Sequence, residues 1–289
     1  PKEYGGGEAT VIAWIWARTV PSPNPACGGA HVPLVRSFWL SKKKGKEAWV
    51  EPVVDRENNT YRFEIRTGKG KPPEGTVNRR GGTCLLSGAP MPFDYIRSEG
   101  KAGRMGARLM AIVAEGPNGR VYLPPSEEHE AVAGQAAPVS VPDTDLPEQA
   151  LGFRVQLYGM TKHRDLFTKR QLTALNTFSN LISEVRERIR QDAVAAGMAD
   201  DGVPLREGGT GATAYADAVA TYLGFAIDRL ADRSSTICSW DTGYVKIRNT
   251  FARQAIPMTW DFAEANPMSE YTGNFYSAVH WVSEVIEGV

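Results

Sequence analysis

Cys27 and Cys84 are the residues of this 289-residue chain whose setting is most similar to that of metal ligands, since each lies in a short, turn-forming segment. A structural zinc ion needs four closed ligands, usually thiolates or imidazoles. Ser22 and Ser87 stand where a second cysteine would complete each pair, and the only nearby imidazole is His31. Because serine keeps its proton at neutral pH, we expect packed turns without zinc. A disulfide between the two cysteines is the alternative, and it would require an oxidising compartment.

Five basic residues lie close to glycines and are candidates for phosphate contact: Arg79, Arg80, Lys101, Arg104 and Arg108. Arginine binds phosphate through paired N–H donors, and glycine lets backbone N–H groups come close to a phosphate oxygen. Such residues suit contacts with a nucleic-acid backbone. The alternative is that they are solvated charges on loop tips. We predict a nucleic-acid contact at these residues.

A third candidate segment, residues 247–264, is dense in aromatic side chains and in polar groups that need partners. The residues singled out in it are Arg248, Asn249, Arg253, Trp260 and Asp261. Shortly after it, residues 266–268 read Asn-Pro-Met, which is superficially similar to the Asn/Asp-Pro-Pro-Tyr motif of amino-methyltransferases. That motif needs its second proline and its aromatic residue to hold and stack a flipped base. Neither is present, so we interpret these three residues as a loop.

Motifs of an independent enzyme are missing from the sequence. It has no lysine-containing phosphate-binding loop, no Gly-x-Ser-x-Gly turn, and no histidine pair at helical spacing. We therefore expect no catalytic residue in this chain.

Composition limits the class of protein further. The 33 basic and 33 acidic residues give a net charge of zero, which argues against coating nucleic acid by bulk charge. A hydrophobic content of 42% supports a packed core. Three cysteines are not a secreted disulfide framework, and no apolar run approaches the ~20 residues that span a bilayer. We expect a cytoplasmic protein without a membrane partner, and we interpret both chain ends as cut from a longer protein.

Three regions must position the candidate residues. Residues 1–125 are mostly β, and residues 126–165 combine a short helix with a proline-rich linker. Residues 166–289 are mainly helical, so the predicted fold class is α+β. The strands are expected at 10–20, 32–40, 48–54, 60–66, 107–114 and 120–123. A hairpin is expected to join 48–54 to 60–66, and the Asn118-Gly119 turn to join 107–114 to 120–123.

The helical region has a clear starting signal. Thr168 and Gln171 fit a capping box, in which each side chain bonds the backbone N–H of the other residue. Apolar residues at helical spacing follow, and Gly197 is a plausible stop. Two further helices are expected at about 210–233 and at 275–286.

Several stretches together resemble one protein family. They are residues 13–20, 33–43, 92–97, 99–106 and 248–264. The chain resembles the central segment of a large, poorly characterised prokaryotic family of adenine-specific DNA methylase-like proteins that carry a zinc-ribbon-like insert. The resemblance covers nearly the whole chain.

This resemblance implies that a glycine-rich S-adenosylmethionine motif precedes the segment and that the catalytic Asp-Pro-Pro-Tyr motif follows it. Neither motif occurs here, so the chain would hold no cofactor, and the parent protein would use S-adenosylmethionine. The resemblance also implies a four-cysteine zinc ribbon, from which the chain departs at Ser22 and Ser87. Some family members are associated with phage defence.

The leading hypothesis is a non-catalytic segment that contributes DNA contact or target recognition to a DNA (adenine) methyltransferase. Its partners would be DNA and the remaining halves of the parent enzyme, with residues 248–264 beside the catalytic core. A structural or protein-interaction insert without nucleic-acid contact is the alternative, because the net charge is zero and the helices are long and amphipathic.

Overall fold

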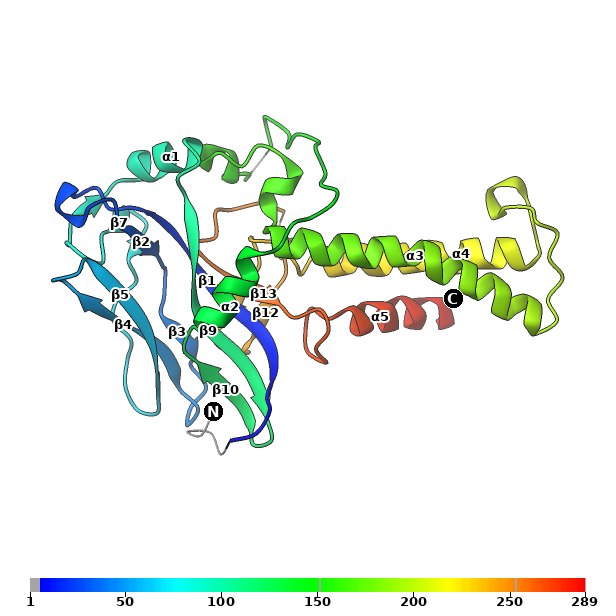
Figure 1. The fold of residues 1–289 in the computed structure, drawn as a ribbon, viewed down its shortest axis with the longest axis horizontal. Helices are drawn as coiled ribbons and strands as arrows, with labels where there is room; N and C mark the ends of the chain where they lie inside the picture. Colours follow the sequence, from blue (N-terminus) through cyan, green and yellow to red (C-terminus); the bar gives the residue numbers. More distant parts are fainter. Residues whose placement is uncertain (1–5, 151, 253, 289) are drawn as a thin grey trace.

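The computed structural model describes residues 6–150, 152–252 and 254–288. Strands dominate the first half of the chain and helices the second half, as Figure 1 shows. This arrangement confirms the α+β class expected from the sequence. In the described parts of the chain, no helix is both long and apolar enough to cross a membrane.

The largest sheet is antiparallel and has β1 (Thr10–Pro21) at its centre. β9 (Gly106–Gly116) and β13 (Asp261–Ala265) flank β1, and β10 (Gly119–Leu123) extends the sheet beyond β9. β2 (His31–Leu34) pairs with the final residues of β1. Most of β1 is buried on both faces, so its sequence is a nearly continuous apolar run rather than an alternating one.

Three smaller antiparallel sheets accompany it. Their strands are β3 (Trp39–Ser41), β4 (Ala48–Asp55) and β5 (Thr60–Thr67), then β6 (Val77–Asn78), β7 (Gly81–Thr83) and β8 (Pro90–Met91), and finally β11 (Ser239–Asp241) and β12 (Lys246–Arg248). The β4–β5 and β9–β10 hairpins confirm the expected pairs. The expected single run at 32–40 is divided into β2 and β3, because the chain leaves the large sheet after Leu34.

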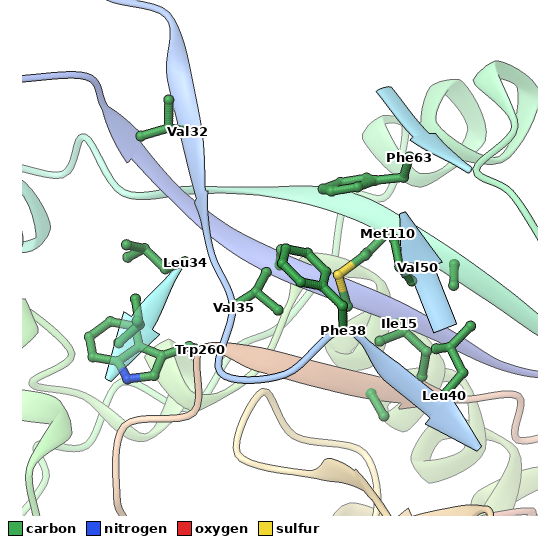
Figure 2. Packing of buried hydrophobic residues seen from close by; sticks show 14 of the residues in the cluster. Ile15, Val32, Leu34, Val35, Phe38, Leu40, Val50, Phe63, Met110 and Trp260 are labelled. Atoms are coloured by element: carbon green, nitrogen blue, oxygen red, sulfur yellow. The ribbon is translucent and has the colours of Figure 1, made fainter. Parts of the chain in front are cut away.

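The main core lies between the large sheet and the β3–β5 sheet. Figure 2 shows Phe38 beside Met110 of β9, with Val50 of β4 close to them. Ile15 of β1 and Trp260 belong to the same buried cluster. The core therefore joins residues from the beginning, middle and end of the chain.

Five α-helices and four 3₁₀ turns complete the described fold. The helices are α1 (Phe93–Lys101), α2 (Glu127–Gly134), α3 (Lys169–Ala195), α4 (Ala212–Ala231) and α5 (Phe275–Glu287). The 3₁₀ turns are η2 (Pro25–Cys27), η3 (Val155–Tyr158), η4 (His163–Leu166) and η5 (Leu205–Glu207). We call α3, α4 and α5 together the arm, since they project away from the sheets in Figure 1.

The start and end of α3 follow the sequence prediction. Thr168 accepts from the N–H of Gln171, and the Gln171 side chain accepts from the N–H of Thr168, which confirms the capping box. Gly197 has φ +93°, a left-handed conformation that favours glycine, just beyond the helix end. The 27 residues of α3 give a helix of about 40 Å, which forms the long edge of the arm.

Buried Arg18 ties the end of α4 and the approach to β13 onto β1. Its Nε donates to the Thr259 carbonyl at 2.8 Å, and its Nη2 donates to Thr236 Oγ1 at 2.8 Å. The guanidinium lies 5.2 Å from the ring centre of Phe262. Burial lowers the pKa of Arg18 to about 10. The second half of the chain is thus fixed to the central strand by a charged group as well as by β13.

α1 and β13 are among the elements that the sequence did not predict. α1 occupies residues 93–101, a stretch that the sequence analysis leaves without an element, and β13 places residues 261–265 in the large sheet. Pro92 precedes α1 and makes no side-chain cap bond, so the usual starting signal is missing. β13 is short and depends on pairing with β1.

Candidate functional site

The two cysteine-containing turns meet in the structure. Ser22 Oγ lies 3.2 Å from Cys84 Sγ, and the backbone N–H of Ser87 donates to the same sulfur at 3.4 Å. Burial raises the pKa of the Cys84 thiol, but hydrogen bonds, chiefly from Ser22 and Ser87, outweigh burial and lower it overall. Cys27 is buried in the same core cluster, and both cysteines are free. Among the described residues, no group of three or more histidine, cysteine or acidic side chains could hold a metal ion.

The exposed basic residues lie at both ends of α1. Arg79 and Arg80 are exposed in the turn between β6 and β7. This turn approaches the start of α1 closely, since a Cβ on Gly81 would lie 2.9 Å from the Met91 carbonyl oxygen. Lys101 is exposed at the last position of α1. Arg79 and Arg80 therefore lie near the start of α1, and Lys101 lies at its end.

Arg104 and Arg108 have partners within the chain. Arg104 donates twice to the buried carboxylate of Glu99, at 2.6 and 2.8 Å. The hydrogen bond from Arg104 lowers the pKa of Glu99 against the opposing effect of burial. The Arg108 guanidinium lies 4.4 Å from the ring centre of Tyr61. Glu99 compensates the charge of Arg104, and Arg108 packs against Tyr61. Both arginines therefore stabilise the fold as well as facing the surface.

Arg97 is a basic residue that the sequence analysis does not single out. It lies four residues before Lys101, so the two side chains share one face of α1. Its guanidinium carbon lies 5.8 Å from the ring centre of Phe93 and 6.0 Å from that of Tyr158. Its Nη1 pairs with Asp94 at 3.0 Å, and its buried Nε has no partner. The i, i+4 spacing becomes a signal only once α1 is recognised as a helix.

Arg248 and Asn249 lie near the end of α4 rather than in a common site with Trp260. Exposed Arg248 lies 3.6 Å from the Asp241 carboxylate. Asn249 Nδ2 donates to Asp232 at 2.7 Å, which joins the end of β12 to the end of α4. Arg253 lies outside the described residues.

Trp260 and Asp261 support the fold at the start of β13. Trp260 is buried, and its ring centre lies 6.2 Å from that of Phe93 and 5.1 Å from that of Tyr158. Asp261 Oδ1 accepts from the backbone N–H of Arg36 at 3.0 Å. Burial raises the pKa of Asp261 to about 6 despite this bond.

A cavity of about 860 Å³ lies between the sheet, α2 and the start of α3. Its wall includes Trp14 and Trp16 of β1, His129 of α2, and Arg170 and Gln171 of α3. This volume is in the usual range for small-molecule sites. None of these five residues is a predicted site residue, because their proximity depends on the pairing of β1 with β13 and on the docking of both helices.

An ion pair closes the floor of this cavity. Glu264 of β13 is buried and accepts from Arg170 Nη2 at 2.7 Å and from Thr168 Oγ1 at 2.6 Å. The Arg170 guanidinium lies 4.3 Å from the ring centre of Trp16. On the other side, Trp14 Nε1 donates to His129 Nδ1 at 3.0 Å. The cavity therefore has an aromatic wall and an internally neutralised charge pair.

Comparisons with known proteins found no matching family model, no matching curated protein and no matching solved structure.

Proposed function

We propose that this chain is a non-catalytic segment of an S-adenosylmethionine-dependent DNA (adenine) methyltransferase, and that it contacts the DNA backbone through the surface of α1. The observation that carries the DNA contact is the exposure of Arg79, Arg80 and Lys101 at the two ends of this helix. The resemblance of the sequence to methylase-like proteins supports the assignment of the parent enzyme and of a cytoplasmic location.

The spacing along α1 suits a nucleic-acid backbone. Nine residues at 1.5 Å each make α1 about 13 Å long, with the β6–β7 turn near its start and Lys101 at its end. Successive phosphates of one DNA strand are about 3.4 Å apart along the helix axis, so this distance spans about four of them. Arg97 lies between the two ends on the face of Lys101.

The cofactor and the target base belong to the remaining halves of the parent enzyme in this proposal. S-adenosylmethionine supplies the transferred methyl group, and its ribose hydroxyls need a free carboxylate. Glu264, the buried acidic residue of the cavity, is already engaged by Thr168 and Arg170 and is therefore not available to bind those hydroxyls. This chain would contribute DNA contact without catalysing methyl transfer.

A DNA titration at several salt concentrations tests the proposal. The informative variant is Arg79→Ala/Lys101→Ala, because both side chains are exposed. Arg104→Ala is unsuitable, since it would leave the buried carboxylate of Glu99 without its partner. Arg188→Ala/Arg206→Ala removes the same charge from the arm and is the matched control.

The arm supports a second function, that of a protein-interaction insert without nucleic-acid contact. Several large apolar side chains of α4 and α5 are exposed, among them Tyr222, Phe225, Trp281 and Val285. Contiguous exposed apolar surface commonly marks a protein interface. Two results together would favour this alternative: DNA does not bind at low salt, and Phe225→Ser/Trp281→Ser weakens a self-association of the chain that sedimentation detects.

A further inference from the structure

We infer that the cavity beneath α2 binds a flat, uncharged heteroaromatic ring that presents hydrogen-bond acceptors, the chemistry of a nucleobase such as guanine. The site shares no residue with the α1 surface, so it goes beyond the proposed DNA contact. Several hydrogen-bonding groups of the cavity already have partners within the chain, whereas two donors have none, and this difference indicates the chemistry of the ligand.

Two donors of the cavity wall are left without partners. Trp16 and Gln171 are 5% and 6% exposed, and both line the cavity. Trp16 Nε1 and Gln171 Nε2 are buried and have no hydrogen-bond partner. Buried donors are normally satisfied, and an unsatisfied donor in a native structure calls for an explanation. A ligand with acceptor atoms supplies one.

Three acceptors of the inner wall are already in use. Glu264 accepts from Thr168 and Arg170. Gln171 Oε1 accepts from the Thr168 N–H at 2.8 Å, which fixes the amide with its nitrogen as the free end. His129 Nδ1 accepts from Trp14, so in the neutral ring Nε2 carries the hydrogen and can donate. The inner wall therefore offers donors, and its occupant must offer acceptors.

The charge of the cavity disfavours an anionic ligand. Arg170 is paired with Glu264, and Glu128 adds a carboxylate at the edge. A phosphate or carboxylate would find no unpaired cation among the residues that line the cavity. A nucleobase edge such as O6 and N7 of guanine supplies two acceptors without a charge.

The walls suit a flat ring. Trp14 is partly exposed and offers an indole surface, and bases stack on aromatic side chains and on arginine planes. Ala133, Ala174 and Ala265 line the cavity with small side chains that leave room for a ring.

Trp16 Nε1 and Gln171 Nε2 are both buried, so part of the cavity wall must move before a ligand can reach them, and α2 is the candidate. The helix has no buried residue. It is held by the Trp14–His129 bond, by Glu130 Oε1, which accepts from the Leu109 N–H at 3.0 Å, and by the Ala133 carbonyl, which accepts from Arg170 Nη1 at 3.5 Å. An outward shift of this short helix would expose Trp16 and Gln171 without breaking the sheet.

Nuclear magnetic resonance of the seven tryptophan indole N–H groups tests the site. The probes are guanosine and the trinucleotide TpGpT, and indole is the control ligand because it is flat but offers no ring acceptor. Guanosine is expected to shift the Trp16 signal, which Trp16→Phe identifies. If guanosine binds and TpGpT does not, the ligand of the cavity is a free nucleoside. If TpGpT binds more tightly than guanosine, the ligand is a base within a strand. No shift of the Trp16 signal with either probe, or equal binding of indole, overturns the inference.

Two variants of the cavity sharpen the test. Gln171→Glu keeps the acceptor that caps α3 and replaces the free donor, so it should weaken guanosine binding by about tenfold or more. Ala174→Leu fills the cavity and should abolish binding while the fold is retained. The matched controls are exposed Gln149→Glu and Ala195→Leu, which should bind like the parent chain. Unchanged binding in a folded Ala174→Leu protein also overturns the inference.

Discussion

At the scale of single residues, the two cysteine turns bring Ser22 and Ser87 close to the Cys84 sulfur. Ser22 Oγ and Cys84 Sγ are 3.2 Å apart, whereas two thiolates on one zinc ion at 2.3 Å each stand about 3.8 Å apart. A small local adjustment would therefore bring a cysteine at position 22 into a shared coordination sphere.

The first prediction follows from this distance. Ser22→Cys/Ser87→Cys should bind about one zinc ion per chain, because four thiolates would then be available in two adjoining turns. The check is metal content after dialysis, together with the loss of thermal stability on adding a chelator. Ser22→Ala/Ser87→Ala is the control and should bind none. A double cysteine variant without zinc would show that Cys27 does not face the other three positions.

The second prediction concerns Asp261, whose pKa burial raises to about 6. A carboxyl group whose pKa is higher in the folded than in the unfolded chain contributes its full stabilisation at pH values below the unfolded pKa, near 3.8. This stabilisation is lost as the pH rises through the folded pKa of about 6. Asp261→Asn keeps an acceptor for the Arg36 N–H and removes the carboxylate charge. It should raise the unfolding free energy by about 1–2 kcal/mol at pH 7.5 and by much less at pH 4.5.

Denaturant unfolding at the two pH values provides the measurement. The matched control is Asp143→Asn, because Asp143 is exposed and its hydrogen bond with Lys162 lowers its pKa. An equal effect of Asp261→Asn at both pH values would contradict the account.

At the scale of elements, the start of α3 connects the arm to the sheet. Thr168 caps α3, and its hydroxyl also donates to buried Glu264 of β13. Arg170, in the first turn of the same helix, pairs with the same carboxylate. One cap residue thus takes part in helix initiation and in the satisfaction of a buried charge.

The third prediction compares two helix caps. Thr168→Ala should lower the unfolding free energy by about 2 kcal/mol, because both the cap and a bond to a buried carboxylate are lost. Ser126→Ala at the cap of α2 should cost no more than about 1 kcal/mol, since that helix has no buried residue. Thermal or denaturant unfolding measures both, and equal losses would contradict the dual role of Thr168.

The elements that the sequence predicts are those with local signals. The capping box at Thr168 and the Asn-Gly turn before β10 depend on neighbouring residues, and both elements occur as predicted. β13 depends on a partner about 250 residues away, as in the pair Ala13 and Ala265. Because Trp16 and Gln171 meet only through such long-range packing, the cavity could not be predicted from spacing.

At the scale of the whole molecule, the sheets and the arm differ in how much they bury. β9 has six consecutive buried residues, whereas α3 has three buried residues in 27. Local opening requires less free energy where few apolar contacts are lost.

The fourth prediction is a gradient of hydrogen exchange. Amides of the distal arm, at residues 180–225, should exchange much faster than those of β1 and β9 at neutral pH. Exchange followed by mass spectrometry of peptides measures this directly. Equal protection of the arm and of the central strands would indicate that the arm has more stabilising contacts than its burial shows.

The fifth prediction tests the proposed DNA contact most directly, through the salt dependence of duplex binding by the isolated chain. The slope of log K against log salt changes by about 0.9 per phosphate contact, so Arg79→Ala/Lys101→Ala should reduce its magnitude by about 2. The control Arg188→Ala/Arg206→Ala should leave the slope unchanged. Absence of binding at low salt, or equal slopes for all three proteins, would contradict a DNA-contacting surface on α1.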